Sequence, residues 1–199
     1  EVYQTVKKAE MYGIDIKGVS VDFKKNVDRS KSVAKQLSKG IEFLMKKNSI
    51  THFSGLGKLE SKNHINIIQK SRSKQISAKN IIIATGAKPK TFQNIKIDGK
   101  YIIGSKEALN LIEVPKKIII VGSGAIGCEF AFYFNSFGVD VEIIEMQKRI
   151  LPMEDSEISA ALKDSFVSSG IKVHNNSKVE SIDKLKTKIK VNVTTESES

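Results

Sequence analysis

Three glycines with the spacing of a dinucleotide-binding turn stand out between Ile118 and Met146. Gly122, Gly124 and Gly127 form a G-x-G-x-x-G pattern. Alone the pattern is weak, because glycine-rich turns occur in many α/β sheets without a ligand. Here a strand-like apolar run precedes the glycines, a helical apolar pattern follows them, and an acid closes the next apolar run about 20 residues later. The context therefore predicts a dinucleotide site, with an unliganded turn as the alternative.

Each glycine has its own physical reason for its position. Gly122 permits the tight turn from strand to helix, Gly124 lets the backbone approach a pyrophosphate, and Gly127 lets helix and strand pack closely. The start of the helix presents unpaired N–H groups and the positive end of its dipole, and both attract phosphate. The arrangement predicts that the ligand is a nucleotide pyrophosphate.

Glu145, the acid that ends the second apolar run, predicts which nucleotide binds. Its carboxylate can accept hydrogen bonds from the hydroxyls of an adenosine ribose and would repel a 2′-phosphate, so NAD is favoured over NADP. Glu129 lies on the helix just past Gly127, where spacing alone does not distinguish a site residue from a surface glutamate. We interpret Cys128 as a small buried hydrophobe.

The composition argues against several other classes of protein. Cys128 is the one cysteine among 199 residues, which excludes an intrachain disulfide and an internal dithiol centre and favours a reducing, cytoplasmic compartment. The net charge of +11 comes from scattered lysines without an aromatic platform, so a solvated surface is favoured over nucleic-acid binding. No apolar run is long enough to span a membrane and no secretory signal is visible. We expect no metal site.

The elements that would precede the glycine turn can be outlined from periodicity. A helix ends at Gly13, a long amphipathic helix covers residues 20–47 with Ser20 as its N-cap, and short strands between residues 50 and 78 form a small meander. A buried strand, Ile81–Ala84, then runs into a Thr-Gly turn. We place a domain boundary near Pro115.

The second part alternates strands with helices, which is typical of a parallel, doubly wound α/β sheet. We expect a strand over 117–121, a helix over 125–137 stopped at Gly138, and a strand over 140–145. The apolar residues of the first helix are Ile126, Phe130 and Phe134. Another helix follows, capped by Asp155 or Ser156. Its apolar stripe is Ile158, Leu162 and Phe166. Three short strands close the sequence.

The sequence ATGAKP at residues 84–89, followed about 30 residues later by the glycine turn, resembles the pyridine nucleotide–disulfide oxidoreductases. Further stretches, AEMYGI, GIEFLMKKN and RILPMEDSEIS, are similar to bacterial dihydrolipoyl dehydrogenases within that family. The similarity covers nearly the whole chain. It implies two Rossmann-like domains with small antiparallel meanders: a partial FAD-binding domain over residues 1–114 and a C-terminally incomplete NAD-binding domain over residues 115–199.

The resemblance also implies cofactor-binding roles for particular residues. The residues that would contact FAD are Thr85, Gly86 and Ala87 at the turn and Gly57 through its backbone. The residues that would hold the NAD phosphates are Gly122, Ser123, Gly124, Ala125, Ile126 and Gly127. Glu129 would reach the nicotinamide ribose, Glu145 would hold the adenine ribose, and Val179 would line the adenine pocket.

The implied activity passes electrons from dihydrolipoamide, carried on the lipoyl domains of 2-oxoacid dehydrogenase complexes, through a disulfide and FAD to NAD. The family's first glycine motif, its redox cysteine pair and its catalytic His-Glu pair have no match in this sequence. His52, His64 and His174 match no catalytic position. We therefore expect an internal fragment that is inactive alone and belongs to an enzyme that is a homodimer when complete. Two alternatives stay open: another flavin disulfide reductase, such as glutathione or mercuric reductase, and a non-catalytic NAD-binding remnant.

Overall fold

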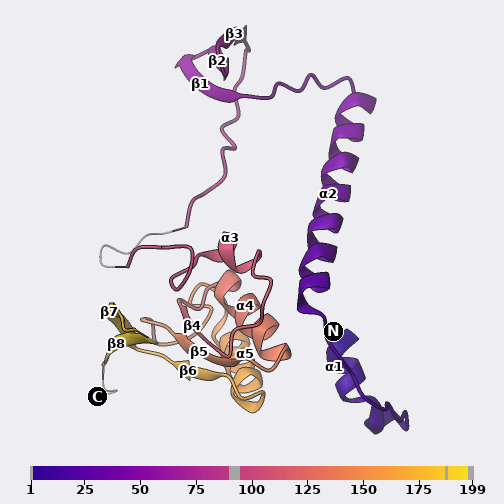
Figure 1. Ribbon diagram of the computed structural model, residues 1–199. Coiled ribbons are helices and arrows are strands. Elements are labelled where there is room, and N and C mark those ends of the chain that lie inside the picture. Colours follow the sequence, from indigo (N-terminus) through magenta and orange to yellow (C-terminus); the bar gives the residue numbers. More distant parts are fainter. Residues whose placement is uncertain (1, 90–94, 187, 197–199) are drawn as a thin grey trace. The chain divides into compact units, whose positions relative to one another are not determined.

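A computed structural model describes residues 2–89, 95–186 and 188–196 (Figure 1). The elements in its first half are α1 (Val2–Lys7), the 3-10 turn η1 (Ala9–Tyr12), α2 (Phe23–Lys47), β1 (Leu56–Ser61), β2 (His64–Gln69), β3 (Arg72–Ser77) and α3 (Ser105–Ala108). The second half contains β4 (Lys117–Val121), α4 (Ala125–Ser136), β5 (Asp140–Ile144), α5 (Ser156–Ser168), β6 (Lys172–His174), β7 (Ser177–Lys184) and β8 (Ile189–Thr195). The chain divides into two compact units, residues 28–88 and the remainder. The predicted boundary near Pro115 stays a prediction.

The larger unit is built on a parallel sheet with strand order β4-β5-β6. Val121 at the end of β4 pairs with Ile144 at the end of β5, and Ile144 pairs with His174 at the end of β6. Because the strands are parallel, these carboxyl ends lie at one edge of the sheet. The predicted strands and the helix between them are confirmed within one residue, and so is the α/β class.

The core of this unit lies between the sheet and the helices α4 and α5. Alternate residues of β5, Val141 and Ile143, are fully buried on one face of the sheet, together with Phe134 from α4 and Phe166 from α5. Both helices therefore pack against this face. Burying a large apolar side chain contributes about 1.5–3 kcal/mol, so this cluster stabilises the strand–turn–helix unit that carries the glycines.

The ends of α4 and α5 follow the expected chemistry with one exception. Gly138, just after α4, has a φ of +84°, and Asp155 caps α5 by accepting a 2.8 Å hydrogen bond from Glu157 N–H. These two predictions are confirmed. The predicted stripe on α5 is wrong at Ile158, which is 59% exposed, because the helix turns Ser159 toward the core instead.

The first residues of the chain pack against α4 in the same unit. Phe23 and Val27 join the core, and the ring of Phe23 meets the ring of Phe137 edge-on at 5.1 Å. Tyr133 donates a 3.0 Å hydrogen bond to Asn26. The helical segment ends at Gly13, as predicted, although its last turn is the 3-10 turn η1; Gly13 has the left-handed conformation.

A two-stranded antiparallel hairpin, β7-β8, completes the larger unit. A bulge interrupts its register between Val179 and Ser181. Lys184 of the hairpin forms an ion pair with Asp98, which also accepts hydrogen bonds from three consecutive N–H groups after it. These bonds, led by the one from Lys184, hold the pKa of Asp98 well below its usual range. The contact ties the segment before β4 to the hairpin.

The smaller unit contains most of α2 and the antiparallel meander β1-β2-β3. The meander confirms the predicted strands between residues 56 and 78, while residues 50–55 form none. Asp22, not Ser20, caps α2, because its carboxylate accepts a 3.0 Å hydrogen bond from Lys25 N–H. The apolar stripe of α2 is solvent-exposed at Leu37 and Leu44.

The predicted buried strand Ile81–Ala84 does not form. Ile82 is 90% exposed and Ile83 is 73% exposed. A strand of a parallel sheet is stable only when neighbouring strands pair with it and helices cover it, and no described residue pairs with this segment. Its sequence has the composition of a core strand, but its surroundings supply no sheet.

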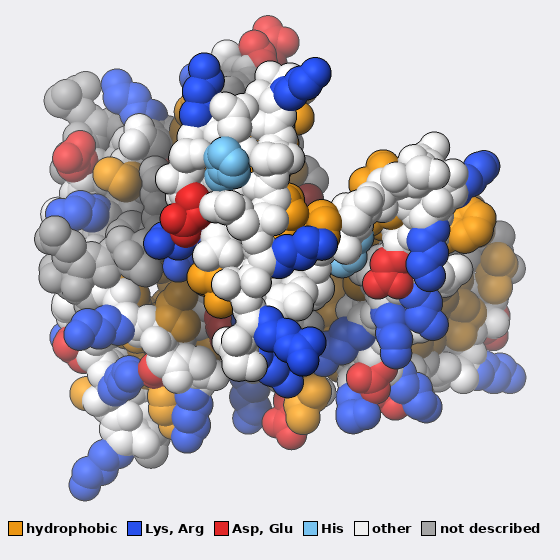
Figure 2. Space-filling view, turned by 90° about the horizontal axis from the view of Figure 1, so that it is seen from above, with side chains coloured by type: hydrophobic (Ala, Val, Ile, Leu, Met, Phe, Trp, Pro, Cys, Tyr) orange, Lys and Arg blue, Asp and Glu red, His pale blue; other side chains and the backbone are white. Residues whose placement is uncertain are grey.

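The surface of the described part carries lysines and arginines dispersed among acidic and apolar side chains (Figure 2). On the face that Figure 2 shows, the basic side chains do not form one continuous patch. Within the described residues, every helix is too short or too polar to cross a bilayer.

Candidate functional site

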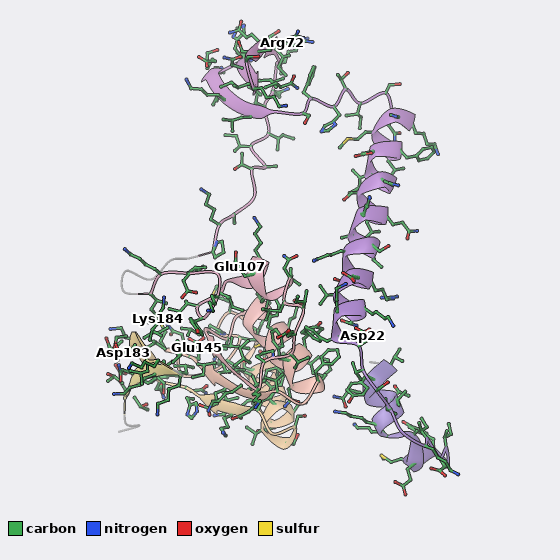
Figure 3. All side chains as sticks on the ribbon, viewed as in Figure 1. Asp22, Arg72, Glu107, Glu145, Asp183 and Lys184 are labelled. Atoms are coloured by element: carbon green, nitrogen blue, oxygen red, sulfur yellow. The ribbon has the colours of Figure 1, made fainter. Side chains whose placement is uncertain are left out.

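The glycine turn lies where β4 ends, next to the end of β5. Glu145, the first residue after β5, lies at this edge of the sheet (Figure 3). Gly122 N–H donates a 2.9 Å hydrogen bond to the carbonyl of Ile144, so the turn remains attached to β5 beyond the last residue of β4. The parallel topology therefore brings the two sequence-predicted features together.

The conformations of the glycines agree with the roles that their spacing predicts. Gly122 has a φ of +96°, which a residue with a side chain rarely adopts. A Cβ on Gly127 would overlap the carbonyl oxygen of Gly122 and lie 3.2 Å from its carbonyl carbon. Gly124 is the N-cap of α4, and a Cβ there would meet no atom within 4 Å, so this side of the turn is open. The turn thus fits a ligand that approaches the backbone at Gly124.

The N-terminal turn of α4 faces this open side with short or exposed side chains. Ala125, Ile126 and Glu129 are exposed, and Ile126 at 61% does not pack toward the core as its period suggests. The first N–H groups of a helix have no partner within the helix, and no side chain caps α4 at Gly124. The backbone donors are therefore suited to an anionic group.

Glu145 is buried, with 5% of its surface exposed, and its carboxylate is held by three donors. Oε2 accepts hydrogen bonds from the N–H and the hydroxyl of Ser123, both at 2.7 Å. Oε1 accepts a 2.8 Å hydrogen bond from Gln147 N–H. A carboxylate has about four acceptor positions, so roughly one position, on Oε1, is left for a ligand hydroxyl.

Ser123 is fully buried at the centre of this arrangement. Besides its two bonds to Glu145, its carbonyl accepts a 2.9 Å bond from Leu151 N–H and a 3.3 Å bond from the thiol of Cys128. The glycine turn is thereby linked to β5, α4 and the loop before α5. From the sequence, Ser123 was predicted only to contact the NAD phosphates. The one sequence signal for its bonds to Glu145 was its hydroxyl, at the position between the first two glycines.

Cys128 is the small buried residue that the sequence predicts, with 6% of its surface exposed. Burial, assisted by the nearby charge of Glu145, raises the pKa of its thiol to about 11. A thiol with such a pKa is a poor nucleophile at neutral pH. Its position favours packing over redox chemistry.

The other predicted site residues lie in different surroundings. Val179 is half-buried in β7, and β7 begins beside the site because Ser177 N–H donates a 2.9 Å bond to the carbonyl of Glu145. Gly57 lies in β1, paired with Ile67, in the smaller unit. The predicted FAD turn, Thr85, Gly86 and Ala87, is exposed and outside any helix or strand. Among the described residues, the glycine turn and Glu145 lie together at one edge of the sheet, and the contacts with NAD and with FAD stay predictions.

A group of ion pairs connects the three strands of the parallel sheet. Lys117 lies 2.7 Å and Lys172 3.1 Å from Glu142, and both lysines also pair with Asp140. The hydrogen bond from Lys117 is the main cause that lowers the pKa of Glu142 below its usual range. These ion pairs join the three strands. The ring of His174 is exposed beside Glu142, and its backbone carbonyl accepts a 2.8 Å hydrogen bond from Glu145 N–H. His52 and His64 are exposed in the smaller unit. Among the described residues no cluster suited to a metal ion occurs.

Comparison with known proteins matches a family model described as pyridine nucleotide-disulphide oxidoreductase to residues 4–199. The dihydrolipoyl dehydrogenase of Chlorobaculum tepidum is 40% identical over 183 residues, 92% of this chain and 39% of the relative. That of Bacillus subtilis is 36% identical over 188 residues, 90% of this chain and 40% of the relative.

Two solved structures resemble the described fold. LpdA from Mycobacterium tuberculosis matches with a TM-score of 0.87 at 23% identity, over 97% of this chain and 43% of its own. The HOCl-induced flavoprotein disulfide reductase RclA from Escherichia coli matches with a TM-score of 0.73 at 28% identity, over 86% of this chain and 39% of its own. The chain spans about two fifths of the length of the proteins it matches.

Proposed function

Since this chain belongs to the pyridine nucleotide-disulphide oxidoreductase family, we propose that it is a segment of an NAD-linked dihydrolipoyl dehydrogenase. The complete enzyme would oxidise dihydrolipoamide on the lipoyl domains of 2-oxoacid dehydrogenase complexes. Support comes from relatives of that name that are 40% and 36% identical over at least 90% of this chain.

The observation that carries the NAD assignment is the glycine turn held against Glu145. NAD, when bound, accepts a hydride. The role of this chain is to bind and orient it: Gly124 and the first N–H groups of α4 would receive the pyrophosphate. Oε1 of Glu145 would accept a bond from the adenosine ribose, and the carboxylate charge would repel a 2′-phosphate. Glu129 would contact the nicotinamide ribose, and Val179 would line the adenine pocket.

The FAD assignment rests on the family and on residues outside the glycine turn. Thr85, Gly86 and Ala87 would contact the flavin nucleotide from their exposed segment, and Gly57 would do so from β1. Gly86 has a φ of +76°, consistent with a turn that brings backbone close to a ligand. A cytoplasmic location and a homodimeric complete enzyme belong to the same proposal.

Replacing Glu145 tests the NAD site directly. Glu145→Arg should weaken NAD binding and improve NADP binding, because a guanidinium attracts the 2′-phosphate that the carboxylate repels. Calorimetric titration of the folded chain with both nucleotides measures the change. Asp164→Arg makes the same charge change at an exposed position of α5 and should leave the preference unaltered. An unchanged preference in Glu145→Arg would refute the assignment.

The activity itself requires the complete coding sequence. The complete enzyme should reduce NAD with dihydrolipoamide, whereas the 199-residue chain with added FAD should not, since its one cysteine cannot form the family's redox pair. Turnover by a pure preparation of the chain would contradict this account.

A second candidate is a flavin disulfide reductase with another substrate. The 28% identity to RclA over 86% of the chain supports this second candidate. The two candidates differ in their disulfide substrate. A complete enzyme that uses NADH to reduce another disulfide, but does not reduce lipoamide, would favour the second candidate.

A further inference from the structure

We infer that Ser123 is a positioning residue that sets the preference for NAD by holding the carboxylate of Glu145. The inference rests on the proposed NAD site and goes beyond it, because it assigns the nucleotide selectivity to a pair of residues instead of to the acid alone. It is carried by the two hydrogen bonds that Ser123 donates to one oxygen of Glu145.

The two donors act from one rigid residue. Ser123 is 0% exposed, and its carbonyl is itself held by Leu151 N–H and by the thiol of Cys128. Its N–H and hydroxyl therefore reach Oε2 of Glu145 from a position that two other segments, the loop at Leu151 and α4, help to determine. Hydrogen bonds to a charged acceptor are stronger than neutral ones, and two of them to one oxygen define the direction of the carboxylate.

The remaining acceptor capacity explains how this clamp can produce selectivity. Ser123 occupies Oε2, and Gln147 N–H occupies part of Oε1, so Oε1 is the oxygen left for a ribose hydroxyl. With the carboxylate held in this orientation, its charge stays next to the ribose and cannot swing away from an incoming 2′-phosphate. Without the hydroxyl of Ser123, one bond to Oε2 remains and the carboxylate gains freedom to rotate.

The clamp predicts a particular effect on the two nucleotides. Ser123→Ala should weaken NAD binding about fivefold, roughly the loss of one hydrogen bond to a charged group when its neighbour remains. NADP binding should weaken less or improve, because the freed carboxylate can turn from the phosphate. The ratio of the Kd for NADP to the Kd for NAD should therefore fall, by about fivefold if NADP binding is unchanged. A residue that merely supports the fold would weaken both nucleotides alike and leave the ratio unchanged.

A matched control exists in the same unit. Ser159 is also fully buried, with 1% exposed, and its hydroxyl donates a 3.2 Å hydrogen bond to the carbonyl of Leu151 without contacting Glu145. Ser159→Ala removes the same group from the same core and should not change the ratio. Ser123→Thr keeps a hydroxyl and should restore most of the wild-type ratio.

The experiment is calorimetric titration of the 199-residue chain, and of the Ser123→Ala, Ser123→Thr, Ser159→Ala and Glu145→Gln variants, with NAD and with NADP. Circular dichroism verifies that each variant is folded. If Ser123→Ala unfolds the chain, Ser123→Cys keeps the Cβ and fills the buried site while it replaces the hydroxyl with a weaker thiol donor. A lower ratio in Ser123→Ala and in Glu145→Gln, with an unchanged ratio in Ser159→Ala, supports the inference.

The other outcomes separate the inference from the proposed function. If Glu145→Gln lowers the ratio but the Ser123 variants do not, the NAD site stands and the positioning role is overturned. If Glu145→Gln leaves the ratio unchanged, or the folded wild-type chain does not bind NAD, both are overturned. An equal fall of the ratio in Ser159→Ala would also overturn the role of Ser123.

Discussion

The close contact at Gly127 gives the sharpest prediction about the site. A Cβ on this residue would lie closer than 3.0 Å to the carbonyl oxygen of Gly122, a separation that real Cβ atoms essentially never show. The obstructing atom is backbone, so the neighbour cannot rotate away, and α4 must move from β4. Gly127→Ala should therefore disturb the packing of the helix against the strand.

The magnitude follows from two opposing terms. Overpacking against a rigid neighbour costs about 3 kcal/mol, at the upper end of the usual range. Alanine is a better helix former than glycine by about 1 kcal/mol. The net loss of unfolding free energy should be about 2 kcal/mol, which lowers the melting temperature by about 4–8 °C for a chain of this size.

The assay can be confined to the unit that contains the site. The sequence has no tryptophan, and its four tyrosines, Tyr3, Tyr12, Tyr101 and Tyr133, all belong to the larger unit. Tyrosine fluorescence during thermal or urea unfolding therefore reports this unit alone. It measures the loss expected for Gly127→Ala without a contribution from the meander β1-β2-β3.

Gly124→Ala is the matched control. A Cβ at Gly124 meets no heavy atom within 4 Å, so the variant should lose only about 0.5 kcal/mol from the poorer N-cap. It should still weaken NAD binding, because the added methyl occupies the open side of the turn. If Gly127→Ala is as stable as Gly124→Ala, the close approach of helix and strand is not what requires glycine at position 127.

Three further predictions concern the surroundings of the site. Burial and a pKa of about 11 should make the thiol of Cys128 unreactive toward Ellman's reagent at pH 8 in the native chain and reactive once urea unfolds it; prompt native labelling would contradict its buried position. The pKa of Glu142 is lowered in the fold, mainly by the hydrogen bond from Lys117, so its carboxylate stabilises the fold above its ordinary pKa of 4.5. This stabilisation is lost as the pH falls below that value. The unfolding free energy of Glu142→Gln should therefore decrease less in acid than that of the wild type, and identical acid profiles would refute the role. Gly40→Ala lies inside α2 with open space around it and should raise the helical stability of the smaller unit by about 1 kcal/mol, measured by circular dichroism, whereas a loss of helicity would show that the glycine is needed there.

Local pattern was sufficient wherever an element is stabilised by its own sequence neighbours. The strand before Gly122, the helix after Gly124 and the left-handed residue at Gly138 all appear as predicted. The helix and the glycine depend on interactions over a few residues, namely a helical period and a conformation that glycine adopts readily. The strand also needs its pairing with β5, which the sequence supplies 23 residues later. The three glycines could be assigned separate roles for the same reason.

Local pattern failed where stability depends on partners distant in sequence. Ile81–Ala84 has the composition of a core strand, yet a strand forms only where neighbours supply its hydrogen bonds. Ile126 and Ile158 fit the helical period but lie on the exposed sides of their helices, since the direction of the core is set by the sheet against which each helix packs.

By itself the sequence determined that three glycines have the spacing of a dinucleotide turn and that an acid follows at the right separation, and it predicted a preference for NAD. Only the tertiary structure decided how the acid is held. The parallel pairing of β4 with β5 brings Glu145 within 2.7 Å of both donors of Ser123, residues that are far apart along the chain. Sequence spacing can bring two residues to the same edge of a sheet, but the direction of a carboxylate is set by the donors that surround it in the folded protein.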